Sequence, residues 1–182
     1  QLLFLQNQFK KKNKINFLPL SGVSNVRTLF CNENGYLAEY ISDRYGFNNP
    51  DFLWEKNNIN FLILGDSFAH GACVNRPNDV AGVLRNKFKH DAINLGYVGN
   101  GPISSLAAYR EYSINNSFNN VVLLYYEGND LLNLNFEIKN EILNQYYKDK
   151  NFSQNLINNQ PRIDSLGVTG YGLIKEYLKK QK

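Results

Sequence analysis

The chain of 182 residues is poor in the residues that bind metals, with two cysteines, two histidines and no methionine. None of the cysteines and histidines has the spacing of a zinc site, so no metal is expected. The sequence also lacks a Gly-x-x-x-x-Gly-Lys phosphate loop, a coiled-coil heptad pattern and any internal repeat. It therefore predicts no bound cofactor and no repeat architecture.

Neither sign of charge dominates, since 20 basic residues stand against 16 acidic ones and the formal net charge is +4. Four lysines between positions 10 and 14 equal that excess, and a second lysine cluster lies between positions 175 and 182. No basic stripe interleaves with aromatic residues near the loops of interest. These lysines are typical of solvated tails, and we expect no nucleic-acid partner.

Long apolar runs are missing as well. The apolar stretch Gln1–Leu5 is far shorter than the about 20 residues that cross a bilayer. It is either part of an ordinary helix or the stub of a longer segment, and in the second case the lysines at 10–14 would favour a cytoplasmic flank. Membrane association stays undetermined.

What the chain does have is a regular alternation of short apolar runs and helical patterns. With 43% hydrophobic residues it can bury one core. Expected strands at 61–65, 92–95 and 121–126 alternate with expected helices at 67–88, interrupted at Pro77, at 103–114 and at 130–148. The third of these strands is expected to be fully buried. Alternation of this kind predicts an α/β fold with a parallel sheet, whose strands all end at one edge.

The remaining segments are less regular. Residues 1–58 are predicted to be a lead-in that packs on the core, and residues 59–182 the α/β domain itself. The polar stretch Asn151–Gly172 is typical of an insertion or a lid. A lysine-rich helix is expected at Tyr171–Lys182.

A serine follows the first expected strand directly. Gly65-Asp66-Ser67 comes after the apolar run Phe61–Leu64, so Ser67 would open the next helix. Unpaired N–H groups at a helix N-terminus favour a developing negative charge, as acyl transfer requires. The alternative is an ordinary helix N-cap, in which the serine has no chemical role.

Two further loops complete a recognisable set. Gly65-Asp66-Ser67, Asn94 to Gly99 and Gly128-Asn129-Asp130 resemble, in this order, three blocks of the SGNH (GDSL-type) serine hydrolases and acyltransferases. The resemblance covers roughly residues 40 to 135 and includes the lead-in Ser42–Asn49. It implies a three-layer αβα sandwich with a flavodoxin-like parallel sheet that acts on a small-molecule or carbohydrate ester. It also favours the cell envelope as the location of the protein.

The resemblance implies a role for one residue in each block. Ser67 is the expected nucleophile. The N–H groups of Ser67 and Gly99 and the side-chain amide of Asn129 are the expected donors to the oxyanion, with Gly99 selected by its distance from Asn94. The alternative for Asn129 is a turn residue whose side chain caps the following helix.

The general base of this family is missing, because no Asp-x-x-His block occurs in the chain. His90 lies at the basic end of an expected helix. His70 follows Ser67 by one helical turn, a poor position from which to reach its hydroxyl, and is expected to be a packing or substrate-lining residue. The sequence therefore predicts a truncated domain whose catalytic Asp and His lie downstream. The alternative is a non-catalytic α/β binding module that kept the crevice without the base.

The two cysteines allow two interpretations. Cys31 and Cys73 are either buried apolar residues or the partners of a disulfide that ties the lead-in to the rim of the site.

Overall fold

The computed structural model describes residues 17–33 and 35–179, with side chains up to Gly170. The apolar stretch Gln1–Leu5 and the lysines at 10–14 lie outside the described residues, as do the side chains of the second lysine cluster. The division at residue 58 between lead-in and domain stays a prediction.

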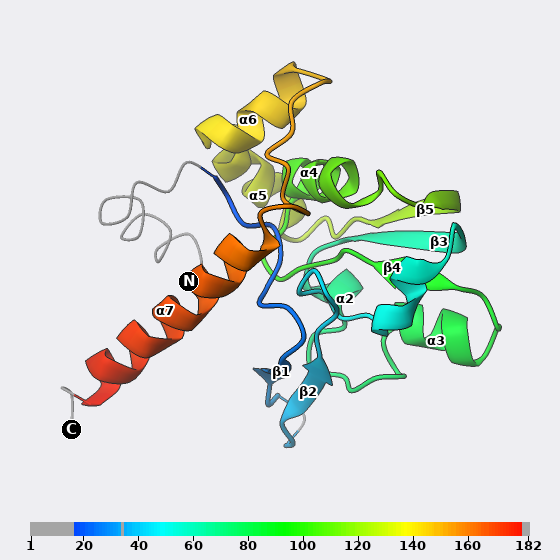
Figure 1. Cartoon of the computed structure of the whole chain (residues 1–182), viewed down its shortest axis with the longest axis horizontal. Coiled ribbons are helices and arrows are strands. Elements are labelled where there is room, and N and C mark those ends of the chain that lie inside the picture. Colours follow the sequence, from blue (N-terminus) through cyan, green and yellow to red (C-terminus); the bar gives the residue numbers. More distant parts are fainter. Residues whose placement is uncertain (1–16, 34, 180–182) are drawn as a thin grey trace.

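A parallel sheet lies at the centre of the described residues (Figure 1). Its strands β3 (Asn58–Gly65), β4 (Ala92–Asn94) and β5 (Ser117–Leu124) are arranged in the order β4-β3-β5. Helices α2 (Ser67–His70), α3 (Val80–Asn86) and α4 (Pro102–Tyr112) connect them. The fold is thus mixed α/β, with a three-stranded parallel sheet flanked by helices in the part of the chain that is described.

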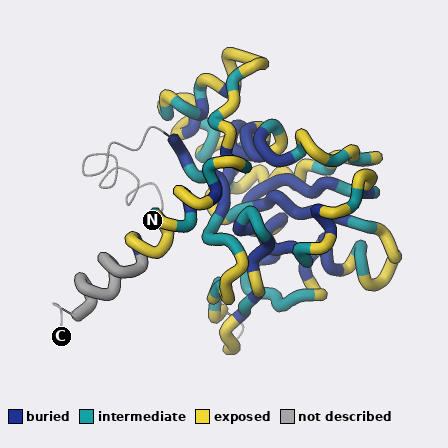
Figure 2. Tube along the Cα trace, in the orientation of Figure 1, coloured by how far each residue is buried: buried dark blue, intermediate teal, exposed yellow. Residues whose placement is uncertain are grey.

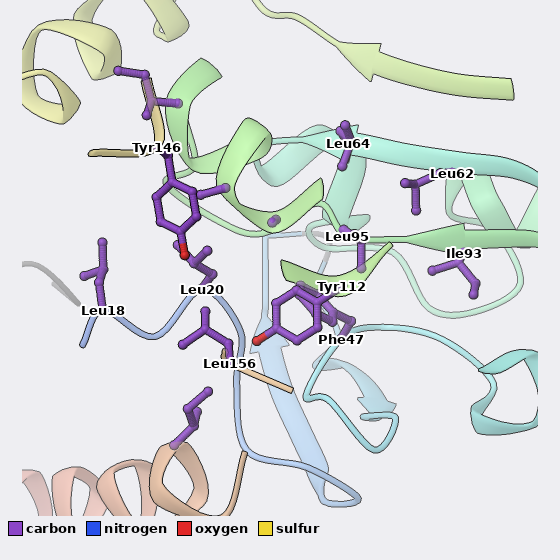
Figure 3. Packing of buried hydrophobic residues seen from close by; sticks show 14 of the residues in the cluster. Leu18, Leu20, Phe47, Leu62, Leu64, Ile93, Leu95, Tyr112, Tyr146 and Leu156 are labelled. Atoms are coloured by element: carbon purple, nitrogen blue, oxygen red, sulfur yellow. The ribbon is translucent and has the colours of Figure 1, made fainter. Parts of the chain in front are cut away.

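Alternate side chains of β3 supply two separate apolar clusters, because successive residues of a strand point to opposite faces. Leu62 and Leu64 belong to the larger cluster, together with Tyr112 of α4 (Figure 3). Ile63 packs instead with Ala69 of α2 and Ala81 of α3. This alternation fixes the register of β3, so the position of Ser67 after its end is fixed too.

Strand β5 is less buried than predicted. Val121 and Leu123 keep 49% and 47% of their surface exposed, and Tyr125 and Tyr126 beyond the strand are about as exposed. The prediction of a fully buried strand at 121–126 is wrong, because within the described residues β5 pairs with β3 alone. It is the edge of the described sheet, and one face of it is open.

The expected helix at 67–88 is two short helices. α2 ends at Gly71, whose φ of 79° lies in the left-handed region that favours glycine. α3 begins after Asp79, whose side chain accepts a hydrogen bond from the N–H of Gly82. The interruption at Pro77 is therefore confirmed, but the helix before it is a single turn.

The expected helix at 130–148 is also divided, into α5 (Asp130–Glu137) and α6 (Glu141–Lys148). The side chain of Asn140 accepts hydrogen bonds from the N–H groups of Ile142 and Leu143. Asparagine is a strong N-cap, so a new helix starts where the apolar pattern alone indicated a continuous one.

The stretch 151–172, predicted to be an insertion or a lid, is bound to the core near its start. The N–H groups of Gln154 and Leu156 donate to the buried carboxylate of Glu111, which fixes this stretch to α4. α7 (Gln160–Lys179) then begins well before the helix expected from Tyr171. It extends away from the rest of the protein (Figure 1), and its described side chains are mostly exposed (Figure 2). None of the described helices is both long and apolar enough to cross a membrane.

The lead-in contains elements that the sequence did not predict. Strands β1 (Arg27–Cys31) and β2 (Ala38–Ile41) form an antiparallel pair, and a 3₁₀ helix η1 spans Asp51–Glu55. A disulfide joins Cys31 to Cys73. Of the two interpretations of the cysteines, the structure has the disulfide, which ties the β1–β2 pair to the segment between α2 and α3.

Candidate active site

Ser67 is the first residue of α2, one residue after the N-cap Asp66. One carboxylate oxygen of Asp66 accepts the N–H of Phe68 at 2.9 Å. Ser67 is half-buried, and no described residue forms a hydrogen bond with its Oγ or its N–H. Because α2 is one turn long, the macrodipole of the predicted long helix is absent. Ser67 therefore offers a backbone N–H group and a hydroxyl that are both free to form hydrogen bonds.

Asn129 is held beside Ser67 through Asp66. The Asn129 Nδ2 donates to the second carboxylate oxygen of Asp66 at 3.1 Å. Although Asn129 occupies the N-cap position of α5, its side chain makes no capping bond. Because a carboxylate oxygen only accepts hydrogen bonds, the Asn129 side-chain atom that faces Asp66 is the amide nitrogen and not the amide oxygen. One amide hydrogen is used by Asp66, and the second is available to another acceptor.

Gly99 lies in the turn that follows β4. The N–H of Asn100 donates to the carbonyl of Tyr97 at 3.0 Å, and Gly99, with φ +84°, is the third residue of this turn. A Cβ at Gly99 would meet open space, so the backbone conformation, not crowding, favours glycine. The Gly99 N–H takes no part in the bond that closes the turn and can donate outward.

Gly96 has a different role from Gly99. A Cβ at Gly96 would lie 2.5 Å from Cβ of Ala69 and 2.7 Å from the backbone N of His70. These distances are too short for any side chain, so Gly96 lets the chain after β4 pass directly against α2. The N–H of Tyr97 then donates to the carbonyl of Gly65 at 3.1 Å.

His70 supports the turn that carries Gly99. Its Nδ1 accepts the N–H of Val98 at 3.3 Å, and its Nε2 lies 2.9 Å from the hydroxyl of Tyr40. Because Nδ1 accepts, the ring proton is on Nε2 and donates to Tyr40. Phe30 and Tyr97 contact the ring, with centroids 4.1 and 4.8 Å away. Both nitrogens are occupied away from Ser67, which agrees with the prediction of a packing or substrate-lining residue.

Burial lowers the pKa of His70 to about 3. The unfolded chain, with a histidine pKa of about 6.5, therefore binds the proton more readily between these values. The stabilisation by neutral His70 is complete above about pH 6.5 and is lost as the pH falls. Between pH 7 and pH 5 the free energy of unfolding should drop by about 2 kcal/mol on this account. Denaturant titrations at both pH values test this, and His70→Gln should flatten the dependence whereas His90→Gln, which removes an exposed histidine, should not.

His90 cannot act as the general base for Ser67 either. It is exposed and lies two residues before β4 begins, whereas Ser67 follows the end of β3. Because β3 and β4 are parallel, His90 lies at the N-terminal ends of these strands and Ser67 at their C-terminal ends. The two histidines of the sequence thus provide no general base for Ser67.

Two asparagines of the lead-in bind the ends of β4 and α2, and sequence reasoning assigned them no role. Asn49 exchanges two hydrogen bonds with the backbone of Asn94 at 2.8 and 2.9 Å. Asn48 donates to the carbonyl of His70 at 3.2 Å. The lead-in therefore positions the ends of both β4 and α2. Their place in the stretch Ser42–Asn49, which takes part in the family resemblance, was the available signal.

Asp43 holds this lead-in in place. One oxygen accepts the N–H groups of Tyr45 and Phe47, both at 2.9 Å. The other accepts Asn49 Nδ2 at 2.9 Å and Trp54 Nε1 at 2.8 Å. Burial raises the pKa of the Asp43 carboxyl, and the four hydrogen bonds oppose that rise. Each oxygen is satisfied by two donors, so Asp43 fixes the conformation of the whole segment.

Two neighbouring cavities adjoin these loops. Ser67 and Val98 line the first, of about 820 Å³, together with the Cys31–Cys73 disulfide. Gly99 and Val98 line the second, of about 630 Å³. Phe30 and Val98 belong to both, so the two cavities adjoin at these residues. Asn129 lines neither, and its connection to the site is its bond to Asp66.

The disulfide also bears on metal binding. Among the described residues, Cys31, Glu33 and Cys73 lie close enough together to hold an ion. Both sulfurs are joined to each other, so neither offers the thiolate that a metal requires. The chemistry that the arrangement allows is instead that of the Ser67 hydroxyl beside the free N–H of the same residue.

The structure thus attaches two of the predicted loops to the two ends of the segment that holds Ser67: Asn129 to the N-cap Asp66, and the turn of Gly99 to His70, the last residue of α2. Comparison with family models, curated proteins and solved structures finds no match to this chain.

Proposed function

We propose that this chain carries the nucleophile and oxyanion donors of an SGNH-type serine enzyme that hydrolyses or transfers acyl esters. Ser67 is the nucleophile, and the N–H groups of Ser67 and Gly99 and the amide of Asn129 hold the oxyanion. The observation that carries the proposal is the hydrogen bond from Asn129 to Asp66. An asparagine that only shaped the turn would cap α5, which Asn129 does not do.

The finer fold assignment belongs to the same proposal. Helices that contact both faces of the parallel sheet are consistent with a three-layer, flavodoxin-like sandwich. The open edge of β5, with Val121 and Leu123 exposed, leaves room for further strands. The disulfide is compatible with an oxidising compartment such as the cell envelope.

The reaction would proceed by nucleophilic catalysis. The Oγ of Ser67 attacks the ester carbonyl carbon while a general base removes the hydroxyl proton, and the alcohol leaves with that proton. Water, or a sugar hydroxyl, then takes the acyl group from Ser67. His70 and His90 are unsuited to this role, so among the described residues no histidine supplies the base.

A second candidate rests on the same two histidines. With both nitrogens of His70 occupied, the chain could be an α/β binding module that keeps the crevice without catalysis. The two candidates differ in whether the Ser67 hydroxyl reacts when a base is provided.

Imidazole in solution can provide that base. We expect p-nitrophenyl acetate plus imidazole to acetylate the protein at Ser67, detected by mass spectrometry of the Ser67 peptide. Ser67→Ala should abolish this product, whereas Ser113→Ala, at the far end of α4, should leave it unchanged. A wild-type protein that acquires no acetyl group at Ser67 would support the binding module instead.

A further inference from the structure

The second cavity, of about 630 Å³, is of the size that binds small organic ligands. Its wall is mostly apolar and comes from segments that are far apart in the sequence. Leu20 of the lead-in and Phe30 of β1 contribute from one side, and Phe136 of α5 and Leu143 of α6 from the other. Leu20 and Leu143 are fully buried, while Phe136 is 64% exposed. The cavity is thus an apolar recess with an apolar residue at its exposed rim.

One polar group in this wall lacks a partner. Asn100 is 7% exposed, and its buried Nδ2 donates to no described residue. A buried donor without an acceptor is costly, so it marks a position where a ligand oxygen would be stabilised. Asn100 directly follows Gly99, whose N–H is free to donate. Two donors therefore lie next to each other in sequence at the wall of an apolar recess.

The charged groups around the cavity disfavour an anionic ligand. Among the described residues, neither a lysine nor an arginine lines it. Its carboxylate, Glu137, already accepts the N–H groups of Gly101, Ile103 and Ser104 at the start of α4. The His70 ring in its wall is neutral. A ligand here would be uncharged, with an apolar body and a hydrogen-bond acceptor.

We propose that this cavity binds the hydrocarbon chain of the acyl group that is transferred to Ser67, so that the substrates are neutral esters of long-chain acids. The inference rests on the proposed function, because it takes Gly99 as an oxyanion donor. A carbonyl oxygen near the Gly99 N–H directs its acyl chain toward Asn100 and the recess. The alcohol part of the ester lies in the neighbouring cavity, which Ser67 lines.

Binding can be measured without catalysis, with 2-decanone as a neutral ligand that has an alkyl chain, a carbonyl and no leaving group. In calorimetric titrations we expect saturable binding, and at least tenfold weaker binding of decanoate, whose charge meets no cation among the described residues of the wall. Ser104→Phe, which fills the recess from α4, should weaken 2-decanone at least tenfold. Asn100→Leu should weaken it about tenfold by removing the donor.

One variant serves as a control. Asn78→Leu, which changes an exposed asparagine of the neighbouring cavity, should bind 2-decanone as the wild type does. With imidazole present, p-nitrophenyl decanoate should acylate Ser67 at least tenfold faster than the acetate, and Ser104→Phe should remove this preference. Circular dichroism verifies that each variant folds.

The outcomes separate the two proposals. Unchanged 2-decanone affinity in both Ser104→Phe and Asn100→Leu would overturn the assignment of the cavity, as would equal or tighter binding of decanoate. If 2-decanone binds as described and Ser67 is never acylated, the proposed function fails and the cavity remains a site for neutral apolar ligands. If Ser67 is acylated with no preference for the longer chain, the assignment of the cavity fails alone.

Discussion

Replacing Asp43 by alanine should lower the free energy of unfolding by about 4 kcal/mol. The carboxylate accepts hydrogen bonds from the backbone at Tyr45 and Phe47 and from the side chains of Asn49 and Trp54. Asp43 is fully buried, so the variant leaves four donors without an acceptor. Each such group costs about 1–3 kcal/mol, reduced where the segment relaxes or admits water. Urea titration at pH 7 measures the loss.

The matched control is Asp51→Ala, a second aspartate of the lead-in. Asp51 forms an ion pair with Arg44 at 2.7 Å, but both side chains are partly exposed. Such pairs contribute about 0–1 kcal/mol, so this variant should remain close to the wild type in stability. A loss below about 1 kcal/mol in Asp43→Ala would mean that the lead-in is not held by this carboxylate.

The sheet could be predicted from the sequence because its signal is local. The apolar run Phe61–Leu64 is bounded by a glycine, and the expected strands overlap β3, β4 and β5. The convergence of their loops follows from parallel topology alone. What the runs do not encode is the neighbour of each strand. The exposure of β5 depends on which strand lies beside it, and that is a tertiary property.

The missed elements share a different cause. β1 has no buried side chain, and it is tied to the core by the disulfide to Cys73, 42 residues away in sequence. The start of α6 depends on one side-chain cap, at Asn140. Neither feature produces the apolar periodicity from which helices and strands are read, so sequence reasoning had no signal for them.

The candidate site shows the same limit. A turn at Gly128-Asn129-Asp130 was evident, and Asp130 does accept the N–H of Tyr126 at 2.7 Å. That Asn129 would turn away from α5 toward Asp66, 63 residues earlier, could not be derived from local propensity, which favours the cap. Only the family resemblance indicated a role for this side chain beyond the turn.

That role leads to the largest expected effect on activity. Asn129→Ala should slow the imidazole-assisted acylation of Ser67 by p-nitrophenyl acetate by roughly 10²–10³, or about 2.7–4 kcal/mol of transition-state stabilisation. The affinity for the ester should hardly change, because the second amide hydrogen of Asn129 meets a full negative charge only as the oxyanion forms. Rates of p-nitrophenolate release over a range of ester concentrations separate the two quantities.

Asn116→Ala is the matched control, since the Asn116 amide also ties two segments together, by donating to the carbonyl of Lys56. Asn116 lies beside the start of β5, at the N-terminal ends of the strands, whereas Ser67 lies at their C-terminal ends. Both variants lose a hydrogen bond and should lose about 1 kcal/mol of stability, but only Asn129→Ala should lose acylation. If both variants are destabilised alike and acylate at the wild-type rate, Asn129 merely secures the turn after β5. The oxyanion would then depend on the N–H groups of Ser67 and Gly99 alone.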